Sequence, residues 1–184
     1  MSQAAYRRLE VDERRAQLLE VGTELFSTHS FEELSMARIA REAGISKALL
    51  YHYFPSKQAY FEATLQAARQ TFPAGRVFAV FQPHLFSRTQ DQAEGFGRAL
   101  LGADMAVVTD VYPSREKPIP GVTGELVVDA AMKSGHRNVR YCPAWKDAAE
   151  LLRHEVAPGD VVITLGAGDV NRLAQALALE EAAG

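Results

Sequence analysis

The segment spanning residues 35–57 carries an excess of cations in a chain whose overall net charge is -3. It contains a single acidic residue, Glu42, against four basic ones. The basic residues are Arg38, Arg41, Lys47 and Lys57. Because contacts to the phosphate backbone supply most of the sequence-independent affinity of proteins for DNA, this local cationic patch predicts contact with phosphates.

A polar loop at residues 82–89 is the second candidate site, because it follows a predicted strand and contains an imidazole and a guanidinium. Ligands of parallel α/β sheets bind at the carboxyl ends of the strands. The sequence therefore places this polar and cationic loop where anions bind in such folds. The alternative is that His84 bonds within its own loop and that Arg88 is a surface cation at the start of a helix.

Helices alone are predicted to position the cationic patch, since apolar residues recur at helical spacing up to about Gln70. The first helix is expected over residues 11–28. Ser35 is placed to cap a second helix, and Gly44 to end it in a left-handed conformation. Ser46 then caps a short third helix, so the pattern predicts a helix-turn-helix.

The third helix, over about residues 47–53, is expected to turn Leu50 and Phe54 inward and to leave its cationic and small side chains outward. Ala48 is slim enough to let the backbone approach base edges, and the neighbouring polar groups can reach bases or phosphates. The serines are alternatively only helix caps. The candidate DNA-binding residues are Ser35, Ser46, Lys47, Ala48, Tyr51, His52, Ser56 and Lys57.

The order of small, apolar and aromatic residues over about residues 10–65 is more specific than a generic turn. Its characteristic positions are Phe31, Ser35, Ile39-Ala40, Ala43-Gly44-Ile45-Ser46, Leu50-Tyr51, Tyr53-Phe54 and Ser56-Lys57. This pattern resembles the DNA-binding domain of the tetracycline-repressor (TetR) family. The resemblance implies a head of three to four helices that binds double-stranded DNA.

The sequence pattern changes in the second half of the chain, where short runs of β-branched residues alternate with helical stretches. Strands are predicted at residues 77–81, 106–111, 139–141 and 161–165, and helices at about 91–101, 124–134, 145–156 and 170–179. This alternation predicts a Rossmann-like parallel sheet of at least four strands with helices on both faces. The whole chain is thus expected to combine an α domain with an α/β domain. Cys142, at the end of a strand, is expected in the core.

Four loops at the predicted carboxyl ends of these strands resemble the Mur ligase family, and within it the C-terminal domain of UDP-N-acetylmuramate:L-alanine ligases. The loops cover residues 81–89, 110–113, 115–121 and 166–169. The resemblance implies that His84 and Arg88 contact the amino-acid or acyl-muramoyl substrate. Leu85 departs from members that place a second arginine there. Arg115, Glu116 and Lys117 are expected to be solvated.

Several absences limit the expected chemistry. The sequence has no Gly-rich loop ending in Gly-Lys-Ser or Gly-Lys-Thr, which would cradle ATP phosphates, so ligation by this chain alone is not expected. We predict no catalytic residue, cofactor or metal. The single cysteine and the lack of an opening apolar run predict a cytoplasmic protein without a membrane segment.

The expected domains are a DNA-binding head at residues 1–61 and a ligase-like body at residues 62–184, joined through a shared helix at about 56–70. Three functional hypotheses remain open. The first is a DNA-binding regulator with a non-catalytic body that senses a ligand or forms a homodimer. The second is a ligase fragment that binds L-alanine or a UDP-N-acetylmuramate-like molecule. The third is an artificial or misassembled chimera without an evolved function.

Overall fold

The computed structural model describes residues 3–28, 34–166, 168 and 170–181 of the 184-residue chain. Helices alone make up the first part of it. They are α1 (Gln3–Thr28), α2 (Met36–Glu42), α3 (Lys47–Tyr53) and α4 (Lys57–Thr71). Gly44, at a φ of 66°, makes the left-handed turn between α2 and α3 that the sequence predicts.

A four-stranded sheet of wholly parallel pairs follows, in the order β3-β2-β1-β4. Its strands are β1 (Val77–Gln82), β2 (Met105–Val108), β3 (Val139–Tyr141) and β4 (Val161–Gly166). The connecting helices are α5 (Phe86–Ala99), η1 (Leu100–Gly102, a 3-10 turn), α6 (Glu125–Lys133), α7 (Trp145–Glu155) and α8 (Val170–Glu181). The predicted combination of an α part with a parallel α/β part is confirmed.

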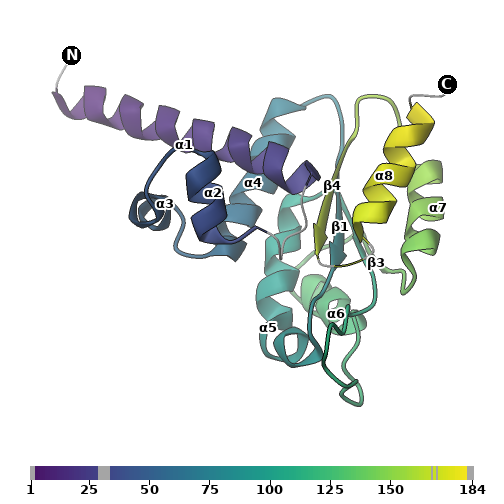
Figure 1. Ribbon diagram of the computed structural model, residues 1–184. Coiled ribbons are helices and arrows are strands. Elements are labelled where there is room, and N and C mark those ends of the chain that lie inside the picture. Colours follow the sequence, from purple (N-terminus) through teal and green to yellow (C-terminus); the bar gives the residue numbers. More distant parts are fainter. Residues whose placement is uncertain (1–2, 29–33, 167, 169, 182–184) are drawn as a thin grey trace.

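Alternating residues of β1 supply both faces of the sheet. Val77, Ala79 and Phe81 belong to the core cluster that also holds buried residues of α4, α5 and α6. Phe78 and Val80 belong to the opposite cluster, which holds buried residues of α7 and α8. Helices therefore cover both faces, as the sequence predicts, and all six residues of β1 are buried (Figure 1).

The start of α5 corrects the sequence prediction. The helix was expected near Asp91, but it begins at Phe86. Leu85, immediately before it, has a φ of 68°, a backbone conformation that no sequence pattern predicts for leucine. Arg88 consequently lies in the first turn of α5, whereas His84 stays in the loop after β1.

The head and the body share one core, because the same cluster of buried side chains runs from α1 through α4 to the sheet. The carboxyl-terminal part of α1 packs near β4, and α4 packs against α5 and η1 (Figure 1). Glycines allow the closest approaches. A Cβ added at Gly102 would lie 2.8 Å from the Leu65 Cβ. No helix within the described residues combines the length and apolar character needed to cross a membrane.

Candidate functional site

The outer face of α3 is the exposed surface of the head that the sequence singles out. Lys47, Ala48, Tyr51 and His52 are all exposed, and the Tyr51 side chain is 41% accessible. Leu50, on the opposite face of the helix, is completely buried. The helix lies at the end of the molecule opposite α7 and α8 (Figure 1). Its exposed residues therefore lie on the side of the helix opposite the buried Leu50.

Each of the three candidate serines caps a helix. The hydroxyl oxygens of Ser35, Ser46 and Ser56 accept hydrogen bonds from backbone N–H groups three residues ahead, at 3.1, 3.1 and 3.0 Å. All three serines therefore act as helix caps, as the sequence predicts. Because each oxygen acts as an acceptor in its cap, its own O–H proton stays available to donate to a phosphate.

Aromatic contacts hold the polar residues of α3 in place. The Lys47 ammonium lies over the Tyr51 ring, 5.6 Å from its centroid. The His52 ring packs edge-on against Tyr53 at a centroid distance of 5.6 Å. Phe54 is buried, in agreement with its expected core role, and Tyr53 is partly buried against the same cluster. Phe31, part of the head pattern, lies outside the described residues.

The second candidate site lies where β1 and β2 end. His84 and Tyr112 form an isolated parallel bridge, and their rings stack at a centroid distance of 5.9 Å and an interplanar angle of 23°. The Leu85 N–H donates to the Tyr112 carbonyl at 3.0 Å, and the Tyr112 N–H donates to the Pro83 carbonyl at 2.8 Å. This two-sided contact holds Leu85 in its left-handed conformation, a kind of strain that clusters at functional sites.

A carboxylate completes this loop arrangement. The Ser87 N–H and hydroxyl both donate to Glu116, at 3.1 and 2.6 Å. The hydrogen bond from the Ser87 side chain is the main cause that lowers the pKa of the Glu116 carboxyl. Glu116 stays partly exposed, and its hydrogen bonds tie the loop after β2 to the start of α5, a contact that the sequence does not predict. Arg88 is partly buried in the same first turn.

Sequence reasoning missed Tyr112, Ser87 and the role of the glycine turn after β4. Gly168 packs so closely on Tyr112 that an added Cβ would lie 2.3 Å from the ring. The Tyr112 ring thus contacts both His84 and Gly168, while 36% of the residue stays exposed. The sheet order could have suggested this grouping, because parallel neighbours β2, β1 and β4 place their carboxyl ends at one edge.

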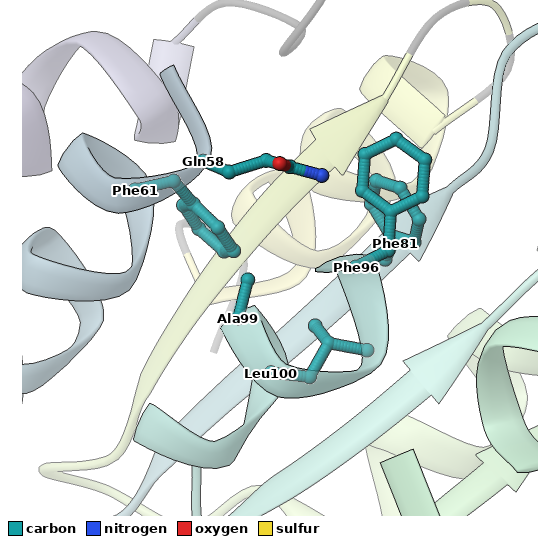
Figure 2. A pocket seen from close by; sticks show the side chains of 6 residues that line it. All are labelled: Gln58, Phe61, Phe81, Phe96, Ala99 and Leu100. Carbon is teal, nitrogen blue, oxygen red and sulfur yellow. The ribbon is translucent and has the colours of Figure 1, made fainter. Parts of the chain in front are cut away.

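The contact between α4 and α5 encloses a small cavity of about 10 Å³. Figure 2 shows Gln58 and Phe61 of α4 facing Phe81, Phe96, Ala99 and Leu100 across it. The Gln58 Nε2 atom is buried and has no hydrogen-bond partner among the described residues. Such a volume holds at most one water molecule, so this cavity is not a ligand site.

Neither candidate site has the features of a metal centre. Within the described residues, no group of three or more His, Cys, Asp or Glu side chains is placed to hold an ion. Cys142 is a free, partly buried thiol that packs against the core cluster beneath α7 and α8, and burial raises its pKa. What the two sites offer is therefore hydrogen-bond donors, cations and aromatic surfaces, which suit the binding of anions.

Comparison with known families divides the chain into two overlapping parts. Residues 18–64 match the family described as "Bacterial regulatory proteins, tetR family". Residues 56–168 match the family described as "Mur ligase, glutamate ligase domain". The overlap, residues 56–64, falls almost entirely within α4. Helix α4 therefore contributes residues to both family matches. The core cluster that it joins also contains buried residues from both matched segments.

Curated relatives resemble the second part. The UDP-N-acetylmuramate--L-alanine ligase of Cutibacterium acnes is 53% identical over 133 residues, which are 72% of this chain and 27% of that protein. The ligase of the same name from Salinibacter ruber is 49% identical over 126 residues, 68% of this chain and 26% of that protein. The chain thus spans about a quarter of the length of these relatives.

Two solved structures are similar to the chain only at low TM-scores. A tetR-family transcriptional regulator from Streptomyces coelicolor is 24% identical, covers 93% of this chain and 68% of its own, and has a TM-score of 0.33. A putative tetR-family regulator from Shewanella gives 21% identity, 77% and 69% coverage and the same TM-score. Scores this low do not relate the whole folds, so the tetR resemblance depends on residues 18–64 alone.

Proposed function

Because the chain belongs to the Mur ligase family through residues 56–168 and carries a tetR-type segment at residues 18–64, we propose that it binds double-stranded DNA with α3 and uses the ligase-type domain as a non-catalytic body. The observation that carries the proposal is the outward face of α3, which is exposed and lies on the side of the helix opposite the buried Leu50. Its cation, small residue and aromatic hydroxyl have the chemistry that DNA binding requires.

The major groove of B-DNA is about 12 Å wide and admits an α-helix. With α3 in that groove, Ala48 allows a close approach to the base edges, and Lys47 reaches a base or a phosphate. Tyr51 and His52 contact the backbone beside them. Lys57 and the hydroxyls of the capping serines add further donors along the same surface. The body keeps α4, and with it the helix-turn-helix, in place through the shared core.

Fluorescence anisotropy with a labelled duplex across a salt series tests this proposal. The affinity is expected to fall linearly with the logarithm of the salt concentration, because each phosphate contact releases counterions. Lys47→Ala should weaken binding and flatten this dependence. Lys146→Ala, an exposed lysine on α7, is the matched control and should change neither. An absence of binding even at low salt would contradict the proposal.

A second candidate function is supported by the loops at the carboxyl edge of the sheet. The strained Leu85 and its hydrogen bonds with Tyr112 fix the backbone between His84 and the first turn of α5, which carries Arg88. The related ligases are named for UDP-N-acetylmuramate and L-alanine. We propose that this edge binds one of these molecules through an anionic group, which would make the body a ligand-sensing module or a ligase fragment.

Titration calorimetry with UDP-N-acetylmuramate and with L-alanine tests this second candidate. Heat of binding is expected for at least one of them, with a loss in Arg88→Ala and a smaller loss in His84→Ala. His154→Ala, an exposed histidine on α7, serves as the control. If neither compound binds the unaltered chain, the body has no ligase-type ligand site and only the DNA-binding proposal remains.

A further inference from the structure

An open groove of about 480 Å³ lies between α1 and the end of α3. Its lining residues are Val11, Glu13, Arg14, Gln17 and Tyr53. The four that belong to α1 are exposed, whereas Tyr53 is partly buried. The groove is thus mainly a polar surface of α1 that faces the carboxyl end of the helix proposed to enter DNA.

Two contacts join this groove to the outward face of α3. The His52 ring packs edge-on against Tyr53, so the groove begins where the exposed face of α3 ends. On the α1 side, the Arg15 guanidinium lies over the ring of Phe54, the residue that follows α3, 5.3 Å from its centroid. The groove therefore keeps its position relative to α3.

We propose that this groove binds one phosphate of the DNA backbone beside the major groove that α3 enters, with Arg14 as the main donor. The inference rests on the proposed DNA-binding function and extends its contact surface to α1. An α-helix with its side chains is about 10 Å across, nearly the width of the major groove. The sugar-phosphate backbones consequently run close to α3, and the groove lies at the carboxyl end of this helix.

The chemistry of the lining residues suits a phosphate. Arg14 carries a guanidinium, whose N–H groups form charge-assisted hydrogen bonds with phosphate oxygens. The Gln17 amide and the Tyr53 hydroxyl are neutral donors at the same groove. Glu13 is the single acidic member and repels a phosphate. Glu13 and Arg14 carry opposite charges. Removal of the Arg14 charge should therefore weaken DNA binding, and removal of the Glu13 charge should strengthen it.

Anisotropy titrations of the full chain with two labelled duplexes of unrelated sequence test the proposal. Arg14→Ala is expected to weaken binding about tenfold on both duplexes, because a phosphate contact carries no sequence information. The slope of log affinity against log salt should fall by about 1, the value for one phosphate contact. Glu13→Gln should raise the affinity, and Arg14→Lys should retain most of it.

The matched control is Arg98→Ala, which removes an exposed guanidinium from α5 in the body. A loss in Arg14→Ala no larger than in Arg98→Ala would overturn the inference, as would a loss on one duplex alone or an unchanged affinity in Glu13→Gln. If Lys47→Ala weakens binding and Arg14→Ala does not, only the groove inference fails. If the unaltered chain binds no DNA, the DNA-binding proposal and the groove inference both fail. Thermal unfolding of each variant verifies that the fold is retained.

Discussion

The Tyr60 hydroxyl, on α4, donates a hydrogen bond to the Leu18 backbone carbonyl on α1. The Tyr60 side chain is completely buried, and its ring packs edge-on against Phe54 at 4.9 Å. The two helices approach so closely here that a Cβ added at Gly22 would lie 2.7 Å from the Tyr60 oxygen. The buried Tyr60 phenol thus links α4, the helix in which the two family matches overlap, to α1, the first helix of the head.

Tyr60→Phe removes this hydrogen bond and leaves the ring in place. We expect a loss of roughly 1–2 kcal/mol in the free energy of unfolding. In a chain of this length that corresponds to about 2–4 °C in Tm for each kcal/mol. Differential scanning calorimetry checks the value, and an unchanged Tm would mean that the hydrogen bond contributes nothing.

The same variant has an alkaline signature, because burial raises the pKa of Tyr60 above its ordinary value of 10.0. The folded state keeps the phenol protonated, so its contribution to stability is complete below pH 10.0 and is lost as the pH rises from there. The unaltered chain should therefore lose this increment of stability at alkaline pH. Tyr60→Phe should lack that component of the loss.

The buried amide of Gln58 at the α4–α5 contact predicts a stabilising substitution. Gln58→Met keeps a similar volume and removes a polar group that has no partner among the described residues (Figure 2). Removing such a group should stabilise the fold by about 1 kcal/mol or more. The expected rise in Tm is about 2–4 °C. Gln66→Met, at an exposed position of the same helix, should leave Tm nearly unchanged, and a lower Tm in Gln58→Met would refute the assignment.

The close contact of Gly168 with Tyr112 predicts a steric penalty beyond the backbone one. Both Gly168 and Gly121 have left-handed φ values, 83° and 79°. A Cβ at Gly121 would meet nothing within 4 Å, whereas at Gly168 it would meet the Tyr112 ring. Gly121→Ala should therefore cost about 1–2 kcal/mol from the backbone alone, and Gly168→Ala should cost more. Equal losses in urea denaturation would show that Tyr112 is not held at this turn.

An acid-dependent stability is expected from Asp160, which pairs with the Arg76 guanidinium at 2.8 Å. Hydrogen bonding to Arg76 is the main cause that lowers the pKa of Asp160 from 3.8 to about 2. Because the folded pKa is the lower one, the stabilisation is present above pH 3.8 and is lost as the pH falls toward 2. Asp160→Asn should be less stable at neutral pH, and its Tm should converge with that of the unaltered chain near pH 2. Parallel Tm profiles would contradict this.

Local signals account for what the sequence predicts correctly. Ser35 and Ser46 predict where α2 and α3 begin, because serine is a common helix cap. Helical periodicity predicts that Leu50 is buried between exposed neighbours. The alternating helices and strands of the second half likewise predict the parallel sheet. These features depend on residues close together along the chain.

The sequence alone does not predict which residues far apart along the chain come into contact in the fold. The packing of Tyr60 on α1 depends on how separate helices meet, and the groove beside Arg14 exists only once α1 and α3 are placed together. The early start of α5 was missed because Leu85 takes a left-handed backbone conformation, which only its hydrogen-bonded neighbour Tyr112 explains. The strand ends that surround Tyr112 come together only in the folded sheet.

The most direct test of the proposal that the head binds DNA is a map of backbone amide NMR signals of the full chain as a duplex is added. We predict changes concentrated in residues 46–53 and at Arg14, with the signals of α7 and α8 unmoved apart from general broadening. The opposite result, changes confined to the body while the signals of α3 stay in place, would contradict the account.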